Sequence, residues 1–456
     1  MTAGEDPGCR EGRASLAGWL RARLPALGLL TLLVAALSLL ANASLLVRSP
    51  RGLRFIPPFR EGVNLNQNHT LGAEYLFVAQ RLAAGKGFSS PFFYETGPTA
   101  WVAPLYSFLL AGLLIVLGTV RRVTAVVVVL QGLTLVATGM IAYELARRRG
   151  GRRLGAVALA FFSLWLIAHF RWFFQTTHDV WLIMASVDAV VLAAAQRWDR
   201  PAAGARWGAV GGVGALASPV LAASWLACSL FLAATDKARR RRVAQSLIVF
   251  ALLLAPWVIR NWAVFDRLIA VKSNLFYDAY HTNYELDSAV IGEGSFATHP
   301  ITLVDGRGKS EYERLGEAAF MDRYRARFLD AVRRDPGRLA GNAARRLAAA
   351  LVCYPPYNRS YEAGALAFKS ALFVLPTLGL LIVLVAWLRG RAAGAEKLAA
   401  VLYLAFLAPY VALSYYARYS LPLSLLATLL VAWGAARIGD RLHAGAADDS
   451  GGGAEP

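Results

Sequence analysis

Acidic side chains next to hydroxyl-bearing or imidazole side chains are the first candidates for chemistry in this sequence. Glu74 precedes Tyr75 in "GAEYLFVAQRLAAGKGF", and Asp179 follows His178 in "QTTHDV". A carboxylate placed where a hydroxyl group arrives can accept its proton. Both pairs could therefore serve general-base chemistry.

Cations stand in other hydrophilic segments. Arg260 ends "APWVIR", Lys272 follows in "AVKSN", and Arg418 precedes Tyr419 in "ARYSLP". Arginine and lysine bind phosphate oxygens through charge-assisted hydrogen bonds. Carboxylates and cations on one face of a protein would suit a site that handles a phosphate group and a proton.

Each of these residues also has a purely structural interpretation. Glu74 could belong to the solvated face of an amphipathic helix, and Asp179 could cap the helix that follows it. Arg260 lies near two tryptophans, as at a membrane interface, while Arg418 could extend towards lipid headgroups. Lys272 could be a solvated loop residue. The residues alone leave both interpretations open.

Long apolar runs must position these side chains. The chain has 456 residues, is 57% hydrophobic and has a mean hydropathy of +0.45. Several runs reach the ~18 residues that a membrane-spanning helix needs, and they are continuous rather than alternating. The sequence therefore predicts an all-α, polytopic transmembrane helical bundle of about 10–11 spans. The apolar runs are 25–47, 101–119, 123–146, 154–170, 180–196, 207–234, 243–264, 366–388, 398–415 and 421–437.

The charge pattern indicates a membrane protein and not a nucleic-acid-binding one. The net charge is +19, but the arginines cluster in short connections such as "RRRGGRR" (147–153) and "RRRR" (239–242). Such clusters mark cytoplasmic connections. The three cysteines are scattered and predict neither a disulfide framework nor a metal site.

The charge pattern also limits the topology. If run 101–119 crossed the membrane, "RRRGGRR" would fall outside, against the charge rule. If that run lies in or re-enters the outer leaflet, and if run 207–234 is two helices hinged at Pro219, nearly all arginine clusters are cytoplasmic. We therefore expect a bacterial inner-membrane protein with its site on the extracytoplasmic face. The expected parts are a cytoplasmic tail (1–24), a transmembrane module (25–264) with outer loop 48–122, an extracytoplasmic loop (265–365) with an amphipathic helix at 310–336, C-terminal transmembrane helices (366–438) and a disordered cytoplasmic tail (439–456).

Five stretches, in order along the chain, resemble the GT-C superfamily of membrane glycosyltransferases. The resemblance is to the dolichyl-phosphate-mannose protein mannosyltransferase-like and aminoarabinose transferase-like branch, and covers roughly residues 20–435. It implies an all-helical bundle with juxtamembrane helices in the first outer loop. The stretches are "GAEYLFVAQRLAAGKGFSSPFFYETGPTAWVAPLY", "APWVIRNWAVFDRLIAVKSN", "HP" with "YERLGEAAF", "DPGRLAGNAARRLAA" and "ARYSLP".

The resemblance also implies a reaction. A sugar would pass, with inversion, from a polyprenyl-phosphate-linked donor to an acceptor that is a protein, a glycolipid or a polysaccharide. Glu74 would be the general base, and Asp179 would orient the acceptor, assist the base or hold a divalent metal ion. The donor phosphate would bind Arg260, Arg418, Lys272 and His299, with further substrate contacts from Tyr75, His178, Glu317 and Tyr419.

Two other functions stay open. Many superfamily members have an aspartate where this chain has Leu71. That departure favours a non-catalytic subunit of an envelope assembly complex. A transporter or flippase of lipid-linked sugars would need a polar path through the bundle, and Asp188 is the one acid well inside a span.

Overall fold

A bundle of helices makes up nearly all of the protein. The computed structural model describes residues 23–46, 71–292, 295, 299–300, 307–355 and 363–450. Two strands of two residues each, β1 (Val290–Ile291) and β2 (Tyr415–Tyr416), pair in parallel. The predicted all-α fold is confirmed. Most of the expected tail 1–24 lies outside the described residues, as does the first part of the expected outer loop 48–122.

Six of the described helical segments are long and apolar enough to cross a membrane. Three shorter apolar helices and the glycine-rich α8 (Ala203–Ala217) accompany them. The figure of about 10–11 spans stays a prediction. The long segments are α2 (Leu24–Leu46), α5 (Val120–Ala168), α10 (Lys237–Phe265), α14 (Ala363–Leu388), α15 (Gly394–Ala412) and the 3-10 helix η3 (Ala417–Leu423) with α16 (Ser424–Ser450); the shorter ones are α4 (Pro104–Leu117), α7 (Val180–Ala194) and α9 (Pro219–Thr235).

Two breaks in the bundle follow from glycine and proline. Gly150 and Gly151 have non-helical backbone angles inside α5, with φ of 70° at Gly151, so α5 is two helices, 120–149 and 152–168. The arginine-rich turn lies at this kink. The run 207–234 divides at Ser218 into α8 and α9, as predicted, and Pro219 takes the first position of α9, where its missing N–H has no helical partner.

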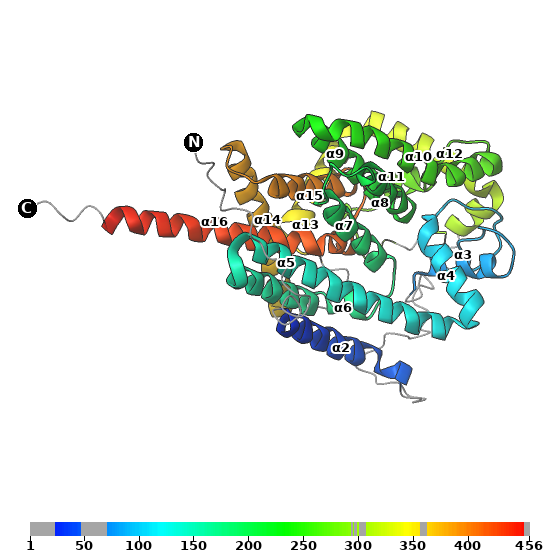
Figure 1. Cartoon of the computed structure of the whole chain (residues 1–456). Coiled ribbons are helices and arrows are strands. Elements are labelled where there is room, and N and C mark those ends of the chain that lie inside the picture. The colour runs from blue at the N-terminus through cyan, green and yellow to red at the C-terminus, as the bar shows by residue number, and fades with distance from the viewer. Residues whose placement is uncertain are drawn as a thin grey trace, which may run out of the picture.

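The first outer segment contains α3 (Ala73–Ala83) and α4, which pack against each other. α4 has 14 residues, so it is ~21 Å long against the ~30 Å of a bilayer core. This length favours the prediction that run 101–119 does not cross. Figure 1 shows α3 and α4 at the end of the molecule opposite to the one from which α16 projects.

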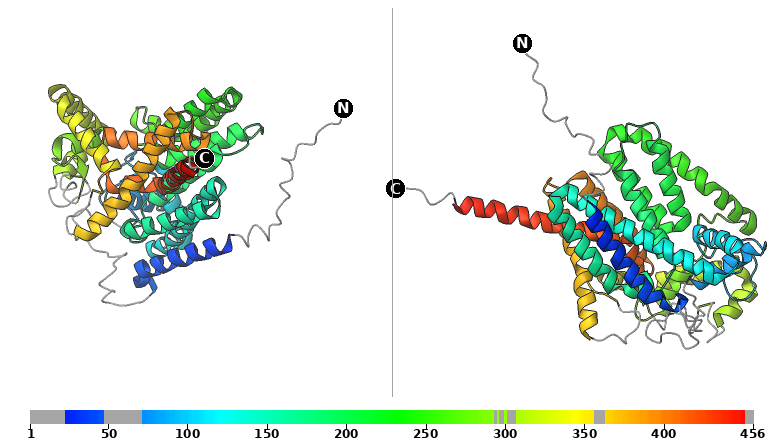
Figure 2. Two further views of the ribbon diagram at one scale, coloured as in Figure 1. Left: turned by 90° about the vertical axis from the view of Figure 1, so that its left-hand side faces the viewer. Right: turned by 60° about the horizontal axis from the view of Figure 1, so that its bottom comes forward.

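Close backbone contacts join the helices of the bundle. A Cβ atom at Gly208 of α8 would lie 2.3 Å from the Ser246 carbonyl oxygen of α10, and one at Gly379 of α14 would lie 2.3 Å from the Leu430 carbonyl oxygen of α16. Small residues at such contacts let helices approach where apolar side chains alone gain little from association in lipid. On another side, α2 packs along α5 (Figures 1 and 2).

The second outer segment folds as α11 (Leu275–Tyr280), the π-helix η1 (His281–Glu285), α12 (Arg307–Arg334) and α13 (Pro336–Leu351). The helix expected at 310–336 is interrupted, because Gly316 adopts φ of 71° and ψ of 165°. Beyond that break, Met321, Tyr324 and Phe328 are buried as one face, as expected of an amphipathic helix. That face packs against α11.

The C-terminal helix α16 is longer than expected. It continues to Ser450, into the segment 439–456 that we expected to be disordered. Alanine, leucine and arginine in "ARIGDRLHAGAA" are good helix formers. Figure 1 and the right panel of Figure 2 show this end of α16 extending beyond the other helices.

Candidate active site

A cavity of about 960 Å³ lies where the outer segments meet the bundle. The start of α3 and the start of α7 line one side, and the segment 267–283 lines another. An apolar limb runs between α7, α9 and α10, with the α8–α9 break at Ser218 in its wall. The apolar limb is lined by Ile183, Val220, Leu226, Phe250 and Leu254.

Glu74 stands in the first turn of α3 and faces this cavity. Its Oε1 accepts a 2.7 Å hydrogen bond from the indole N–H of Trp101 and lies 3.6 Å from Nε2 of His299. Burial raises the pKa of Glu74 to about 7, although the charge of Lys272 and the Trp101 hydrogen bond oppose the rise. A carboxylate with a pKa near the working pH is well suited to be a general base.

Asp179, directly before α7, lines the same cavity and is hydrogen-bonded to α3. The hydroxyl of Tyr75 donates a 2.8 Å hydrogen bond to Oδ2 of Asp179. Asp179 occupies the position before α7 but makes no capping hydrogen bond, so the alternative that it caps the helix does not describe its contacts. Burial and the neighbouring Asp179 hold the pKa of Tyr75 well above its usual range, which keeps Tyr75 a hydrogen-bond donor.

Arg418 reaches the same cavity from the chain between α15 and α16. Its Nη1 donates a 2.7 Å hydrogen bond to Nδ1 of His178. Because a guanidinium only donates, this Nδ1 is unprotonated. The guanidinium lies 5.9 Å from the ring of Tyr419, which stacks on Tyr410 at 4.3 Å. Asp179 is the main negative charge acting on Arg418.

Lys272 is another cation that lines the cavity, and Asp278 is another carboxylate. Among the described residues Lys272 forms no ion pair within 4.0 Å, but its charge acts on both Glu74 and Asp278. Burial raises the pKa of Asp278, and Lys272 and His281 oppose this. The sequence analysis missed Asp278, although a single acid in the aromatic stretch "NLFYDAYHTNY" was a usable signal.

His299 is a neutral member of the site. Its ring meets the rings of Phe92, Trp101 and Tyr277 nearly at right angles, at centroid distances of 6.1, 5.6 and 5.4 Å. Burial, followed by the nearby charge of His281, lowers the pKa of His299 to about 3. His299, which the resemblance implied as a contact to the donor phosphate, could therefore contact a phosphate only as a neutral imidazole.

Glu317 lines the cavity but acts as a structural junction. Its Oε1 accepts hydrogen bonds from the Ala100 N–H and the Ser273 hydroxyl, both at 2.7 Å. Its Oε2 accepts from the hydroxyls of Thr99 and Tyr312. One buried carboxylate thus ties the first outer segment to the second. These bonds occupy both oxygens, so Glu317 positions the cavity wall.

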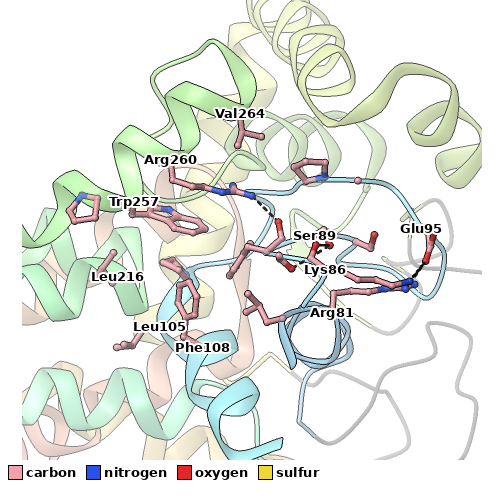
Figure 3. A pocket seen from close by; sticks show the side chains of 18 of the residues that line it. Arg81, Lys86, Ser89, Glu95, Leu105, Phe108, Leu216, Trp257, Arg260 and Val264 are labelled. Atoms are coloured by element: carbon pink, nitrogen blue, oxygen red, sulfur yellow. Dashed lines mark hydrogen bonds and ion pairs between the residues drawn. The ribbon is translucent and has the colours of Figure 1, made fainter. Parts of the chain in front are cut away.

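Arg260 does not line the Glu74 cavity. It donates to the carbonyl oxygens of Thr99 at 2.7 Å and Phe88 at 2.8 Å, and its guanidinium lies 5.1 Å from the ring of Trp257. These contacts place it in a second cavity of about 730 Å³, shown in Figure 3. The segment 97–104 contributes residues to both cavities and separates them.

Leu71, at the place of the superfamily aspartate, is completely buried among the apolar side chains packed around α3. The next residue, Gly72, has φ of +81°, and a Cβ atom there would lie 3.0 Å from Nδ1 of His178. Glycine thus lets α3 begin directly against the turn that carries Asp179. The first acid of α3 that faces the cavity is Glu74.

Within the described parts of the chain, no group of three or more His, Cys, Asp or Glu side chains is arranged to hold a metal ion. Of the ten residues named from the sequence, eight line this cavity: Glu74, Tyr75, Asp179, Lys272, His299, Glu317, Arg418 and Tyr419. His178 is hydrogen-bonded to Arg418, whereas Arg260 lines the second cavity.

No protein-family model and no curated protein matches the sequence. The backbone is similar to solved structures of the archaeal oligosaccharyltransferase AglB from Archaeoglobus fulgidus. One, in complex with an inhibitory peptide and a dolichol-phosphate, matches 96% of this chain and 53% of its own, at 16% identity and a TM-score of 0.53. Another, tethered with an acceptor peptide containing the NVT sequon, matches 93% of this chain and 51% of its own, at 16% identity and a TM-score of 0.54.

This likeness shows the fold. The chain spans about half the length of the oligosaccharyltransferase it matches, and its helices are arranged similarly over that length. A structure of ArnT from Cupriavidus metallidurans bound to undecaprenyl phosphate matches 93% of this chain and 79% of its own at 14% identity, but its TM-score of 0.37 carries no argument. With its long apolar helices, the chain is a multi-pass membrane protein.

Proposed function

We propose that the protein is a glycosyltransferase that moves a sugar from a polyprenyl-phosphate-linked donor to an acceptor hydroxyl group in the Glu74 cavity. One observation carries the proposal. A carboxylate whose pKa is about 7 shares a cavity with Lys272 and Arg418, which come from distant parts of the chain and are two of the four cations that line it. This set combines a proton acceptor with groups that bind phosphate.

The reaction follows from these groups. The acceptor hydroxyl oxygen attacks the anomeric carbon of the donor sugar and gives its proton to Glu74. The bond between that carbon and the phosphate oxygen breaks, and the polyprenyl phosphate leaves with the electron pair. Lys272 and Arg418 stabilise the negative charge that grows on the leaving phosphate. Asp179, held by the hydroxyl of Tyr75, orients the acceptor.

The apolar limb of the cavity suits the polyprenyl chain. It runs between membrane-level helices α7, α9 and α10, and Leu226 in its wall is 39% exposed on the apolar surface. A donor could therefore keep its chain in lipid while its phosphate reaches Lys272. The AglB structure in complex with a dolichol-phosphate supports this class of donor, since dolichol-phosphate is itself a polyprenyl-type phosphate.

The test is donor turnover by the purified protein in lipid nanodiscs. Polyprenyl phosphates carrying a hexose or a pentose serve as probes. Water takes the place of the acceptor hydroxyl, so that the sugar is released by hydrolysis, and the free polyprenyl phosphate is measured without knowing the acceptor. We expect Glu74→Gln to lower turnover by about 10²–10⁴-fold, as loss of a general base does. Glu313→Gln, which changes an exposed carboxylate on α12, should leave turnover unchanged. Equal turnover by the wild type and Glu74→Gln would contradict the assignment of Glu74 as the general base.

We further place the cavity on the extracytoplasmic face of a bacterial inner membrane, as the arginine clusters favour. If proteoliposomes moved a lipid-linked sugar across the bilayer without cleaving its phosphate bond, the protein would be a flippase instead.

A further inference from the structure

The second cavity, formed by the end of α3, the loop 85–98, α4 and α10, has no part in the reaction above. Its volume is about 730 Å³ and its walls are mostly apolar, including Leu105, Trp257 and Leu216 (Figure 3). It opens on side chains that a soluble protein would bury, because Phe108 is 49% and Val264 42% exposed. These belong to α4 and α10, so the opening faces the lipid.

One side of the cavity is cationic. Arg81, Lys86 and Arg260 line it together with Glu95. Figure 3 shows Glu95 extending to the ends of the first two, with its Oε1 2.7 Å from Nη1 of Arg81 and 3.0 Å from Nζ of Lys86. Arg81 and Lys86 thus pair with one carboxylate, and Arg260 adds a third cation to the lining. The excess of positive charge is suited to an additional anion.

The carboxylate itself shows where an anion fits. Glu95 is 68% exposed, so its carboxylate can rotate into solvent at little cost, because water and salt screen an exposed ion pair. Lys86 and Arg81 hold the pKa of Glu95 below its usual range. It is therefore a poor base, and it is the only carboxylate among the described residues that line this cavity. A ligand bound here would be held and not turned over.

We propose that this cavity binds an anionic diacyl phospholipid of the surrounding membrane, separate from the sugar donor at Glu74. Its phosphate takes the place of the Glu95 carboxylate between Arg81 and Lys86, and its acyl chains lie along Phe108 and Leu253. Trp257, beside Arg260, lies at the level where a lipid phosphate is expected, since tryptophans collect at membrane interfaces. The site would bind through charge complementarity at its rim and apolar contact below.

The experiment measures melting temperature in mixed detergent micelles titrated with phosphatidylglycerol or, separately, with phosphatidylcholine. Phosphatidylglycerol should raise the melting temperature of the wild type at lower concentration than phosphatidylcholine. The double variant Arg81→Gln/Lys86→Gln should need at least about tenfold more phosphatidylglycerol, as expected for loss of a charge-assisted contact. Glu95→Gln should need less than the wild type, because the competing carboxylate is gone. This opposite sign distinguishes the site from a general effect of surface charge.

The matched control is Arg197→Gln/Asp199→Asn, which removes another exposed ion pair, with a 2.8 Å contact. It should titrate like the wild type, and all variants should melt alike without lipid. The proposal would be overturned if the two lipids raised the melting temperature equally. It would also be overturned if neither the double variant Arg81→Gln/Lys86→Gln nor Glu95→Gln changed the concentration of phosphatidylglycerol that is needed. A rise in KM for the polyprenyl-phosphate donor in the double variant would overturn it too, because the cavity would then seat the donor. Donor turnover by the wild type is measured separately, so a negative result for phospholipid binding would not contradict the proposed function.

Discussion

Two neighbouring residues of α3, Glu74 and Tyr75, have different partners because a helix turns by about 100° per residue. Glu74 meets Trp101 and His299, whereas Tyr75 reaches Asp179. The helix therefore presents a base directly and a second acid through a tyrosine. No acid is needed at Leu71 for a carboxylate to reach the cavity, and Leu71 is instead part of the apolar core beneath α3.

The pKa of Glu74 sets the expected pH dependence. Only the ionised carboxylate accepts a proton, so kcat/KM for donor turnover should rise with pH and reach half its maximum near pH 7. Lys272 lowers this pKa, so Lys272→Met should move the midpoint to higher pH and also raise KM for the donor. The profile is measured with a polyprenyl-phosphate sugar between pH 5 and pH 9.

Lys309→Met is the control for that shift, because Lys309 lies on α12 near Phe93 and Tyr94 and away from the Glu74 cavity. The pH at which Lys309→Met reaches half its maximal kcat/KM should match that of the wild type. A midpoint that stayed in place in Lys272→Met, or a rate that rose towards low pH, would contradict the electrostatic account of Glu74.

At the scale of helices, the contact of α8 with α10 depends on Gly208. A Cβ atom there would lie 2.3 Å from a main-chain oxygen, which cannot move without shifting α10. We expect Gly208→Ala to lower the free energy of unfolding by about 1–3 kcal/mol, the usual cost of overpacking. Gly112→Ala in α4 has nothing within 4 Å and should be neutral or slightly stabilising. Thermal or denaturant unfolding in detergent compares them, and equal effects would show that α8 does not approach α10 this closely.

Arg346 of α13 connects the outer helices to the chain that carries Arg418. It is completely buried and donates to the carbonyl oxygens of Val411 at 2.7 Å and Ala412 at 2.8 Å, and to Oδ1 of Asn283 at 2.9 Å. These bonds satisfy the last carbonyls of α15, just before β2 and η3. Arg346 thereby fixes the position from which Arg418 enters the cavity.

Arg346→Met should lower the free energy of unfolding by about 3 kcal/mol or more, because several buried carbonyl groups lose their donors. Arg345→Met, one residue earlier and exposed, should change stability by less than about 0.5 kcal/mol. Unfolding in detergent measures both. A loss of the same size in the two variants would mean that Arg346 is not the junction described.

The elements were predictable where local chemistry decides them. Apolar runs and arginine clusters located most helices, and Pro219 and the Gly150–Gly151 pair marked breaks that the structure has. Gly316 was missed, because an isolated glycine in a periodic helix pattern is often tolerated. The extension of α16 was missed because a low-complexity tail resembles disorder in composition.

The positions of the site residues were predictable only to the extent that the membrane topology determines them. Counting spans placed Glu74, Asp179 and Arg418 in one layer, and the structure brings them to one cavity. The count of spans could not show that Arg260 donates to carbonyl oxygens on the other side of segment 97–104. Nor could it show that Glu317 accepts hydrogen bonds from residues more than 200 positions earlier in the sequence. Such contacts depend on tertiary packing, which no local pattern records.

At the scale of the whole molecule, two cavities lie on either side of segment 97–104, and both combine an apolar limb with cations. Only the larger one has a carboxylate with a pKa near neutrality. We therefore propose different places for the reacting lipid and the resident lipid. The Glu317 junction, by holding Thr99 and Ala100, keeps the two cavities apart.

The most direct test of this account is a structure of the protein in nanodiscs with a polyprenyl phosphate, the leaving product, bound. We predict that the phosphate lies in the Glu74 cavity, within hydrogen-bond distance of Lys272 and Arg418, with its chain between α7, α9 and α10. A phosphate found instead beside Arg260, with the Glu74 cavity empty, would contradict the assignment of Glu74 as the base for sugar transfer.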